Sequence, residues 1–177
     1  MSQIEQLATI EGVRATLSPC GAYRYFLSRR SEVAHPDRGT ALFVMLNPST
    51  ADASQDDPTI RRCRRFGRDW GCAGIAVANL YAYRATNPRE LNHCPVDPVG
   101  SNNDLWLRRL ALEYGDVVCA WGANAGPDRV KQVVRIFQNS GAQMWCLGTT
   151  KSGAPRHPLY VKASQPLIPW APESEEA

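Results

Sequence analysis

Hydrophobic and polar residues alternate in two patterns along most of the chain. Continuous apolar runs, typical of strands buried on both faces of a parallel sheet, lie at 41–47, 74–80, 116–122 and 142–148. Between these runs, apolar residues recur every three or four positions, as in amphipathic helices. The predicted helices begin near Asp57, at Asn102 or Asn103, and after Gly126. Because strands and helices alternate, we expect a parallel sheet with helices on both faces.

The N-terminal part of the chain has a different pattern. Residues 12–18 and 23–30 alternate apolar and polar side chains around a Pro-Cys-Gly-Ala turn, which predicts a β-hairpin. We expect this hairpin to extend one edge of a four-stranded parallel sheet. The 177 residues are enough for one complete hydrophobic core. We therefore predict a single three-layer αβα domain over 1–177, with its core at about 12–160 and peripheral tails.

The first predicted helix carries a clear start signal. Asp57 is suited to the N-cap and Pro58 to the first helical position. Its apolar positions fall on one face, and arginines cover the rest. The apolar face consists of Ile60, Cys63, Phe66 and Trp70. The helix should end at Gly71.

Composition and charge narrow the class of protein. The formal net charge is +3, and because residues 173–177 contain three glutamates, the remainder carries +6. This mildly basic balance is compatible with a ligand that bears phosphate. No apolar run approaches the roughly 20 residues that cross a bilayer, and the first residues lack the apolar segment of a secretion signal. We expect a cytoplasmic protein with no membrane partner.

The six cysteines are scattered and form no C-x-x-C pair. This spacing disfavours a disulfide framework and a zinc site. We predict no metal ion and no cofactor.

Polar residues follow the ends of the predicted strands. In open α/β sheets, ligands bind beyond the carboxyl ends of the strands. Asn47 ends the first apolar run, Asn79 lies at the end of the second, and Gly122 ends the third. His157 follows the fourth after a loop. We expect these residues to face one cavity.

These residue types suit recognition of a nucleobase. An amide offers two donors and an acceptor, which match the edge of a base. Tyr81 and Tyr83 could stack on its ring. Histidine can donate to an oxygen that becomes negative as a bond breaks. The backbone N–H groups of the turn at Gly122 suit phosphate, and Asp52, close to Asn47, could activate water.

Four arginines are candidates for binding phosphate. They are Arg61 and Arg62 in the first helical turn, Arg84 after Asn79, and Arg156 before His157. Other interpretations stay open at each position. Asn-Pro is also a common strand-ending turn, and arginines on a helix often form a solvated face. The aspartates at 52, 56 and 57 could be loop residues and a helix cap, or could hold a divalent ion for phosphate chemistry.

Two resemblances add to this interpretation. The blocks LNPSTADASQDDPTIRRCRRF, NLYAYRAT, DPVGSNND and HPLY resemble an uncharacterised bacterial family, domain-of-unknown-function family 1643 (DUF1643), over nearly the whole chain. The order Asn-Pro, strand-ending Asn, W-G-x-x-A and His-Pro over residues 41–160 also resembles the uracil-DNA glycosylase superfamily. The second resemblance implies that Asn47 positions water or the reacting sugar, Asn79 reads the base, and His157 stabilises the departing base.

We therefore expect a domain that recognises a nucleobase in a nucleotide or nucleic acid and hydrolyses an N-glycosidic bond. One alternative is a nucleotide or nucleic-acid binding module without catalysis. A second is a metal-dependent phosphoryl hydrolase that uses the aspartates.

Overall fold

The computed structural model describes residues 15–172. Its strands are β1 (Ala15–Leu17), β2 (Arg24–Arg30), β3 (Arg38–Met45), β4 (Cys72–Asn79), β5 (Asp116–Cys119), β6 (Gln143–Cys146) and β7 (Ile168–Pro169). Its helices are α1 (Pro58–Asp69), α2 (Asn103–Glu113) and α3 (Pro127–Ser140), with short 3₁₀ helices η2 (Pro88–His93) and η3 (Pro158–Tyr160). Residues 12–14 of the predicted hairpin, and the end of the C-terminal tail, lie outside the described residues.

The strands form one mixed sheet in the order β1-β2-β4-β3-β5-β6-β7. Strands β4, β3, β5 and β6 are parallel neighbours. The hairpin of β1 and β2 joins this group antiparallel through β4, and β7 pairs antiparallel with β6. The prediction of a hairpin at one edge is confirmed. The predicted four-stranded parallel sheet is only the centre of a mixed, seven-stranded sheet, because β7 adds an antiparallel strand at the other edge, which the prediction lacks.

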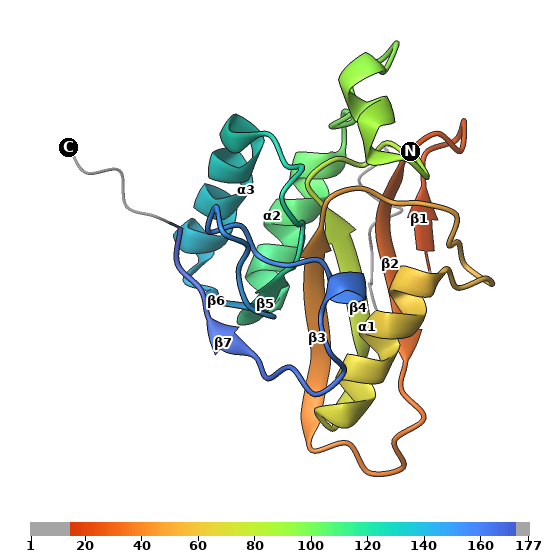
Figure 1. Ribbon diagram of the computed structural model, residues 1–177. Helices are drawn as coiled ribbons and strands as arrows, with labels where there is room; N and C mark the ends of the chain where they lie inside the picture. Colours follow the sequence, from red (N-terminus) through yellow and green to blue (C-terminus); the bar gives the residue numbers. More distant parts are fainter. Residues whose placement is uncertain (1–14, 173–177) are drawn as a thin grey trace.

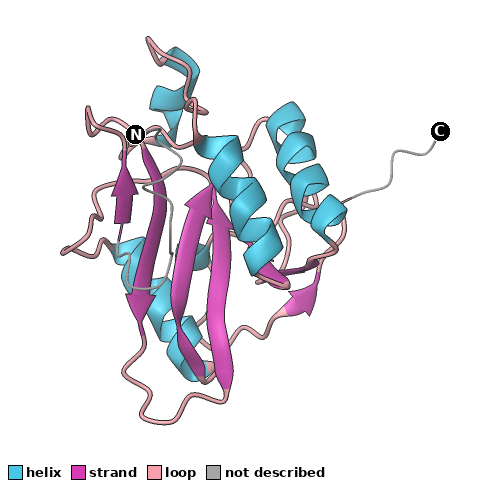
Figure 2. Cartoon of the chain, turned by 180° about the vertical axis from the view of Figure 1, so that it is seen from behind, coloured by secondary structure: helices cyan, strands magenta, loops and turns pink. Residues whose placement is uncertain are grey.

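Helices cover both faces of the sheet, as the alternation of strands and helices predicts (Figures 1 and 2). Successive residues of β3 show why. Phe43 and Met45 pack with the apolar face of α1, whereas Leu42 and Val44 pack with residues of α2 and α3. Side chains alternate across a strand, so a continuous apolar run supplies both cores.

Helix α1 begins as the sequence predicts. The side chain of Asp57 accepts a hydrogen bond from the backbone N–H of Ile60 at 2.9 Å, and Pro58 occupies the first helical position. Ile60 and Phe66, on the apolar face of α1, are buried against the sheet. Within residues 15–172, no helix has the length and apolar character needed to cross a membrane.

Gly74 marks a close approach between β2 and β4. A Cβ atom at this position would lie 2.5 Å from the carbonyl oxygen of Arg29, which belongs to the neighbouring backbone. We expect Gly74→Ala to lower the free energy of unfolding by about 1–3 kcal/mol, because the strands must separate to admit the methyl group. Urea denaturation measures this change.

The matched control is Gly39→Ala in β3, where an added Cβ would meet no atom within 4 Å. Its effect should stay within about 0.5 kcal/mol. Equal losses at Gly74 and Gly39 would contradict the proposed contact.

Candidate functional site

A cavity of about 720 Å³ lies at the carboxyl ends of the parallel strands. It is formed by the segments that follow β3, β4 and β5, the first residues of α1, and the loop that leads into η3. Its walls include Leu46, Asn47, Asp57, Trp121, Gly122 and His157. A larger cavity of about 1010 Å³ opens near the amino ends of β3, β4 and β5. We place the candidate site in the first cavity, because parallel sheets bind ligands at the carboxyl ends of their strands.

The NH₂ group of the Asn47 amide bonds to the protein backbone, and its carbonyl oxygen is available to a ligand. Its Nδ2 donates to the carbonyl oxygens of Ala85, at 2.8 Å, and Pro48, at 3.0 Å. These bonds fix the side chain. Its Oδ1 has no hydrogen-bond partner among residues 15–172, and it is not buried. Asn47 therefore presents a fixed acceptor to the cavity.

His157 presents a donor to the same cavity. Its Nδ1 accepts a hydrogen bond from the backbone N–H of Leu159 at 3.3 Å, which places the proton of the neutral imidazole on Nε2. Burial lowers the pKa of His157 from its ordinary value of 6.5, while the charge of Asp57 acts in the opposite direction. His157 is therefore neutral at pH 7. Within the described residues its Nε2 has no partner and is not sealed from solvent.

Asp57 combines a structural and an electrostatic role. It lines the cavity with only 7% of its surface exposed. Its carboxylate accepts from the N–H of Ile60 and from that of Ala51, the latter at 3.4 Å. A negative charge thus stands at the cavity wall close to His157. The sequence predicts Asp57 as a helix cap, and its place in the cavity wall follows because a helix after a strand begins at the edge where that strand ends.

The link between Asp57 and His157 can be measured. We expect Asp57→Asn to lower the pKa of His157 further, because it removes the charge that raises the pKa and leaves the effect of burial. Asparagine is also a good N-cap, so α1 should keep its start. An NMR titration of the imidazole in both proteins gives the two pKa values. A pKa that rises or stays the same would show that the carboxylate and imidazole do not interact.

Asn79 lies elsewhere than predicted. It is the last residue of β4, paired in register with Met45, and only 1% of its surface is exposed. It does not line the cavity. Both polar atoms of its amide lack a hydrogen-bond partner among the described residues. The expectation that the residues at 47, 79 and 157 share one cavity is therefore wrong for Asn79.

The two tyrosines are also outside the cavity. The hydroxyl of Tyr81 accepts from the backbone N–H of Gly126 at 3.3 Å, which holds the start of α3. Tyr83 pairs with Tyr23 in an isolated bridge, and their rings meet edge to face at 5.8 Å. The cavity wall instead contains two other aromatic side chains, the buried Trp121 and the exposed Tyr160, whose ring lies 5.7 Å from that of His157.

Asp52 stabilises its own loop. Its Oδ1 accepts from the N–H and hydroxyl of Ser54 and from the N–H of Gln55, and these bonds lower the pKa of Asp52. It does not line the cavity. Its position therefore does not suit the activation of water beside Asn47.

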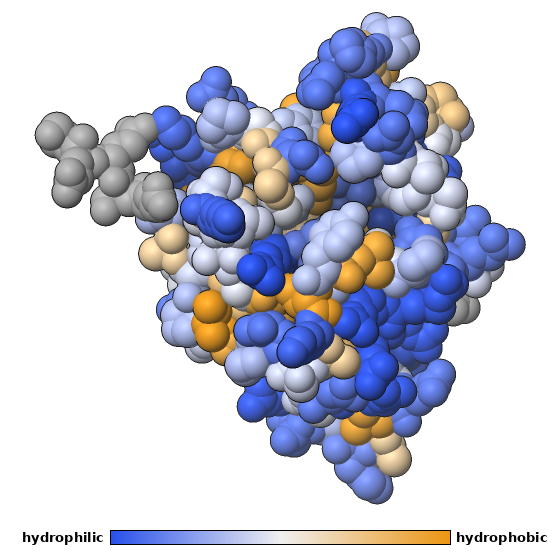
Figure 3. All heavy atoms as spheres, viewed as in Figure 1, coloured by the Kyte–Doolittle hydropathy of each residue, from blue (hydrophilic) through white to orange (hydrophobic). Residues whose placement is uncertain are grey.

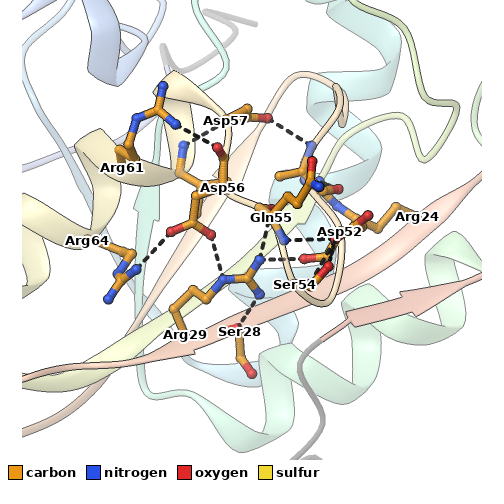
Figure 4. A network of polar contacts seen from close by, with 12 residues as sticks. Arg24, Ser28, Arg29, Asp52, Ser54, Gln55, Asp56, Asp57, Arg61 and Arg64 are labelled. Atoms are coloured by element: carbon orange, nitrogen blue, oxygen red, sulfur yellow. Dashed lines mark hydrogen bonds and ion pairs between the residues drawn. The ribbon is translucent and has the colours of Figure 1, made fainter.

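Asp56 is held by two arginines. Its oxygens contact Arg29 Nε at 2.6 Å and Arg64 Nη1 at 2.8 Å (Figure 4). Burial raises the pKa of Asp56, but the hydrogen bonds from Arg64 and Arg29 outweigh this effect and lower it. Within residues 15–172, no three His, Cys, Asp or Glu side chains are grouped as metal ligands.

Two of the four predicted phosphate-binding arginines brace loops. Arg62 donates to the carbonyl oxygens of Pro158 and Val161, and so ties α1 to η3. Arg84 donates to the carbonyl oxygens of Ser49, Gly21 and Thr50. Neither lines the cavity. These guanidinium groups hold the walls of the site in place.

The remaining candidates differ in their access to the cavity. Arg156 and Lys151 are exposed at its rim, and Arg156 is oriented by a 2.9 Å bond to the carbonyl of Thr149. Gly122 lies in the wall with φ +77°. Its N–H donates to the carbonyl of Pro155 at 2.8 Å, which leaves it unable to bind phosphate. Arg61 lies in a separate groove.

Comparison with known proteins identifies one family. The family described as "Protein of unknown function (DUF1643)" matches residues 24–159. No curated protein and no solved structure matches the chain.

Proposed function

The chain belongs to the DUF1643 family of proteins of unknown function, and from its cavity we propose that it recognises a nucleobase and hydrolyses the N-glycosidic bond to it. One observation carries this proposal. Asn47 Oδ1, an acceptor, and His157 Nε2, a donor when the ring is neutral, are both fixed and both available in one cavity. The cavity volume of about 720 Å³ falls in the range of small-molecule sites.

The cavity offers a group for each change in the reaction. Water adds to C1′ of the sugar as the bond from C1′ to the base nitrogen breaks, and the base leaves with the bonding electrons. The added water then loses a proton to solvent, and the departing base takes up a proton from solvent. Asn47 Oδ1 accepts from this water and orients it. His157 Nε2–H donates to a base oxygen as negative charge develops there.

The sugar becomes positively charged in such a transition state, which resembles an oxocarbenium ion. The carboxylate of Asp57 lies in the cavity wall and can stabilise this charge. Tyr160, exposed beside His157 in the cavity lining, supplies an aromatic surface for the base, and Arg156 and Lys151 at the rim suit the phosphate. The positions of Asn47 and His157 support the resemblance to the uracil-DNA glycosylase superfamily, which is part of this proposal.

The test is release of uracil from a short single-stranded oligonucleotide that contains deoxyuridine, with damaged bases as further substrates. Alkaline cleavage at the abasic site reports the reaction. Activity in the wild type and its loss in Asn47→Ala would support the proposal. Binding without release in the wild type would instead indicate a binding module, and activity abolished by a chelator would indicate metal-dependent chemistry.

A further inference from the structure

A second hollow lies beside α1, apart from the cavity. It is a groove of about 400 Å³ between α1 and the end of β2. Six arginines line this groove: Arg29, Arg30, Arg61, Arg64, Arg65 and Arg68. Deep blue, hydrophilic residues cover the region of α1 in Figure 3. We call this hollow the arginine groove.

A glycine at the floor of the arginine groove lets α1 pack closely on the sheet. Gly67 of α1 faces β4, where a Cβ atom would lie 2.7 Å from Cγ2 of Ile75. The helix therefore packs closely on the sheet at this point. The long arginine side chains rise on both sides of a floor that is partly backbone, so the groove has a defined shape as well as charge.

The charges in the arginine groove are not balanced. Asp56 accepts from both Arg29 and Arg64, as Figure 4 shows. Two further carboxylates, Glu32 and Asp69, form exposed ion pairs with arginines of α1, and such pairs contribute little. Six arginines thus meet three carboxylates, which leaves an excess of positive charge.

Two of the six arginines have their charge available. Arg30 and Arg61 are exposed and have no carboxylate partner within the part of the chain that is described. Arg61 Nη1 donates to the carbonyl oxygen of Asp56, at 2.7 Å. This bond orients the guanidinium without neutralising it.

The arrangement of the arginines indicates an extended ligand. Arg61, Arg65 and Arg68 recur at helical spacing along α1 and span about 10 Å of its axis. A guanidinium group matches the oxygens of a phosphate. One phosphate occupies a few donors, whereas a row of arginines in a groove suits a chain of phosphates.

The arginine groove and the cavity are both lined by residues from the first turn of α1. Pro58 and Thr59 line the cavity, and Arg61, two residues further along the same helix, lines the groove. A strand held in the groove could therefore deliver a neighbouring nucleotide to Asn47 and His157.

We propose that the arginine groove binds the phosphodiester backbone of single-stranded nucleic acid. This inference extends the proposed function, on which it rests, because it makes the substrate a polymer instead of a free nucleotide. The backbone lies along α1, with phosphates contacted by Arg30, Arg61 and Arg65.

Fluorescence anisotropy with a labelled single-stranded oligonucleotide tests the proposal across a series of salt concentrations. The variant Arg61→Ala/Arg65→Ala removes two charges from the groove. The control Arg108→Ala/Arg135→Ala removes two charges from α2 and α3 on the opposite face of the sheet. Melting temperatures confirm that both variants are folded.

We expect the groove variant to bind about tenfold more weakly and its salt dependence, the slope of log K against log salt, to fall by about 1.4. The control should bind nearly as the wild type does. Equal weakening in both variants would overturn the proposal, because it would reflect net charge alone. Absence of oligonucleotide binding by the wild type would also overturn it.

Further measurements distinguish single strands from other ligands, and failure of the groove assignment from failure of the proposed function. Tighter binding of duplex than of single strands, or binding of phosphatidylglycerol vesicles in place of oligonucleotide, would contradict the assignment to single strands. If the groove binds as expected but Asn47→Ala and His157→Ala leave base release unchanged or the wild type releases none, the proposed function fails while the groove assignment stands.

Discussion

Replacing Arg129 with leucine is expected to lower the free energy of unfolding by about 3 kcal/mol, the largest effect on stability that we predict. The Arg129 side chain is only 5% exposed and lies between α2 and α3. Its Nε donates to the carbonyl oxygen of Leu80 at 2.7 Å, and its Nη2 contacts Asp104 Oδ1 at 2.6 Å. Leucine would leave the buried carbonyl and the carboxylate without these donors.

Urea denaturation of the variant and the wild type measures this loss. Arg135→Leu is the matched control, since Arg135 is exposed on the same helix. Its effect should stay within about 0.5 kcal/mol. If the two variants lose the same free energy, Arg129 does not join α3 to the end of β4 as we describe.

Replacing His157 with alanine is expected to slow base release by about a hundred- to a thousandfold, the largest effect on activity that we predict. The variant loses the donor that meets the base oxygen as it becomes negative. His157→Gln should retain more activity, because its amide can supply a neutral N–H donor. His35→Ala, which changes an exposed histidine in the loop before β3, is the control and should match the wild type.

The proposed role of a neutral His157 also predicts in which direction the rate of base release changes with pH. The pKa of His157 lies below 6.5, so the neutral ring is present at neutral and alkaline pH. As the pH falls through the lowered pKa, protonation at Nδ1 breaks the bond from Leu159 and places a positive charge beside the developing oxocarbenium ion. Activity should therefore fall on the acid side only. Activity that rises as the pH falls through this range would contradict a neutral donor.

The same shift affects stability. Because the folded chain binds a proton at His157 less readily than the unfolded chain, this residue favours folding above pH 6.5. The contribution is lost as the pH falls below that value. His157→Gln should remove this part of the pH dependence.

The sequence predicts the strands and helices well because their signals are local. Apolar runs mark β3 and β4, and Asp57 with Pro58 marks the start of α1. The two-residue strand β7 has no such signal. It lies in a proline-rich tail, and its pairing with β6 depends on where that tail returns to the sheet.

The sequence also brings Asn47 and His157 to one cavity but misplaces Asn79. The apolar run at 74–80 places Asn79 at the end of its strand, and the predicted site puts its side chain at the ligand edge. Backbone pairing instead continues beyond β4, since Leu80 N–H donates to Met45 and Tyr81 N–H donates to Leu46. Asn79 is therefore still inside the sheet, where its amide is buried. A shift of one or two residues at a strand end decides whether a side chain reaches the ligand.

The arginines show a second limit of sequence analysis. Arg62 reaches carbonyl groups at 158 and 161, which are close to it only after folding. A guanidinium group has several donors that suit loop carbonyls as well as phosphates. Sequence spacing cannot distinguish these partners. It also could not show that arginines of β2 and α1, far apart in the chain, line one groove.

The central claim is that Asn47 and His157 contact the same ligand, and side-chain NMR tests it most directly. A uracil-containing single-stranded oligonucleotide is titrated into ¹⁵N-labelled protein, with the exposed amide of Asn139 as the reference. We predict that the Nδ2 amide signals of Asn47 and the imidazole signals of His157 shift along one saturation curve while Asn139 does not. Unchanged signals from both Asn47 and His157 at saturating oligonucleotide would contradict the account.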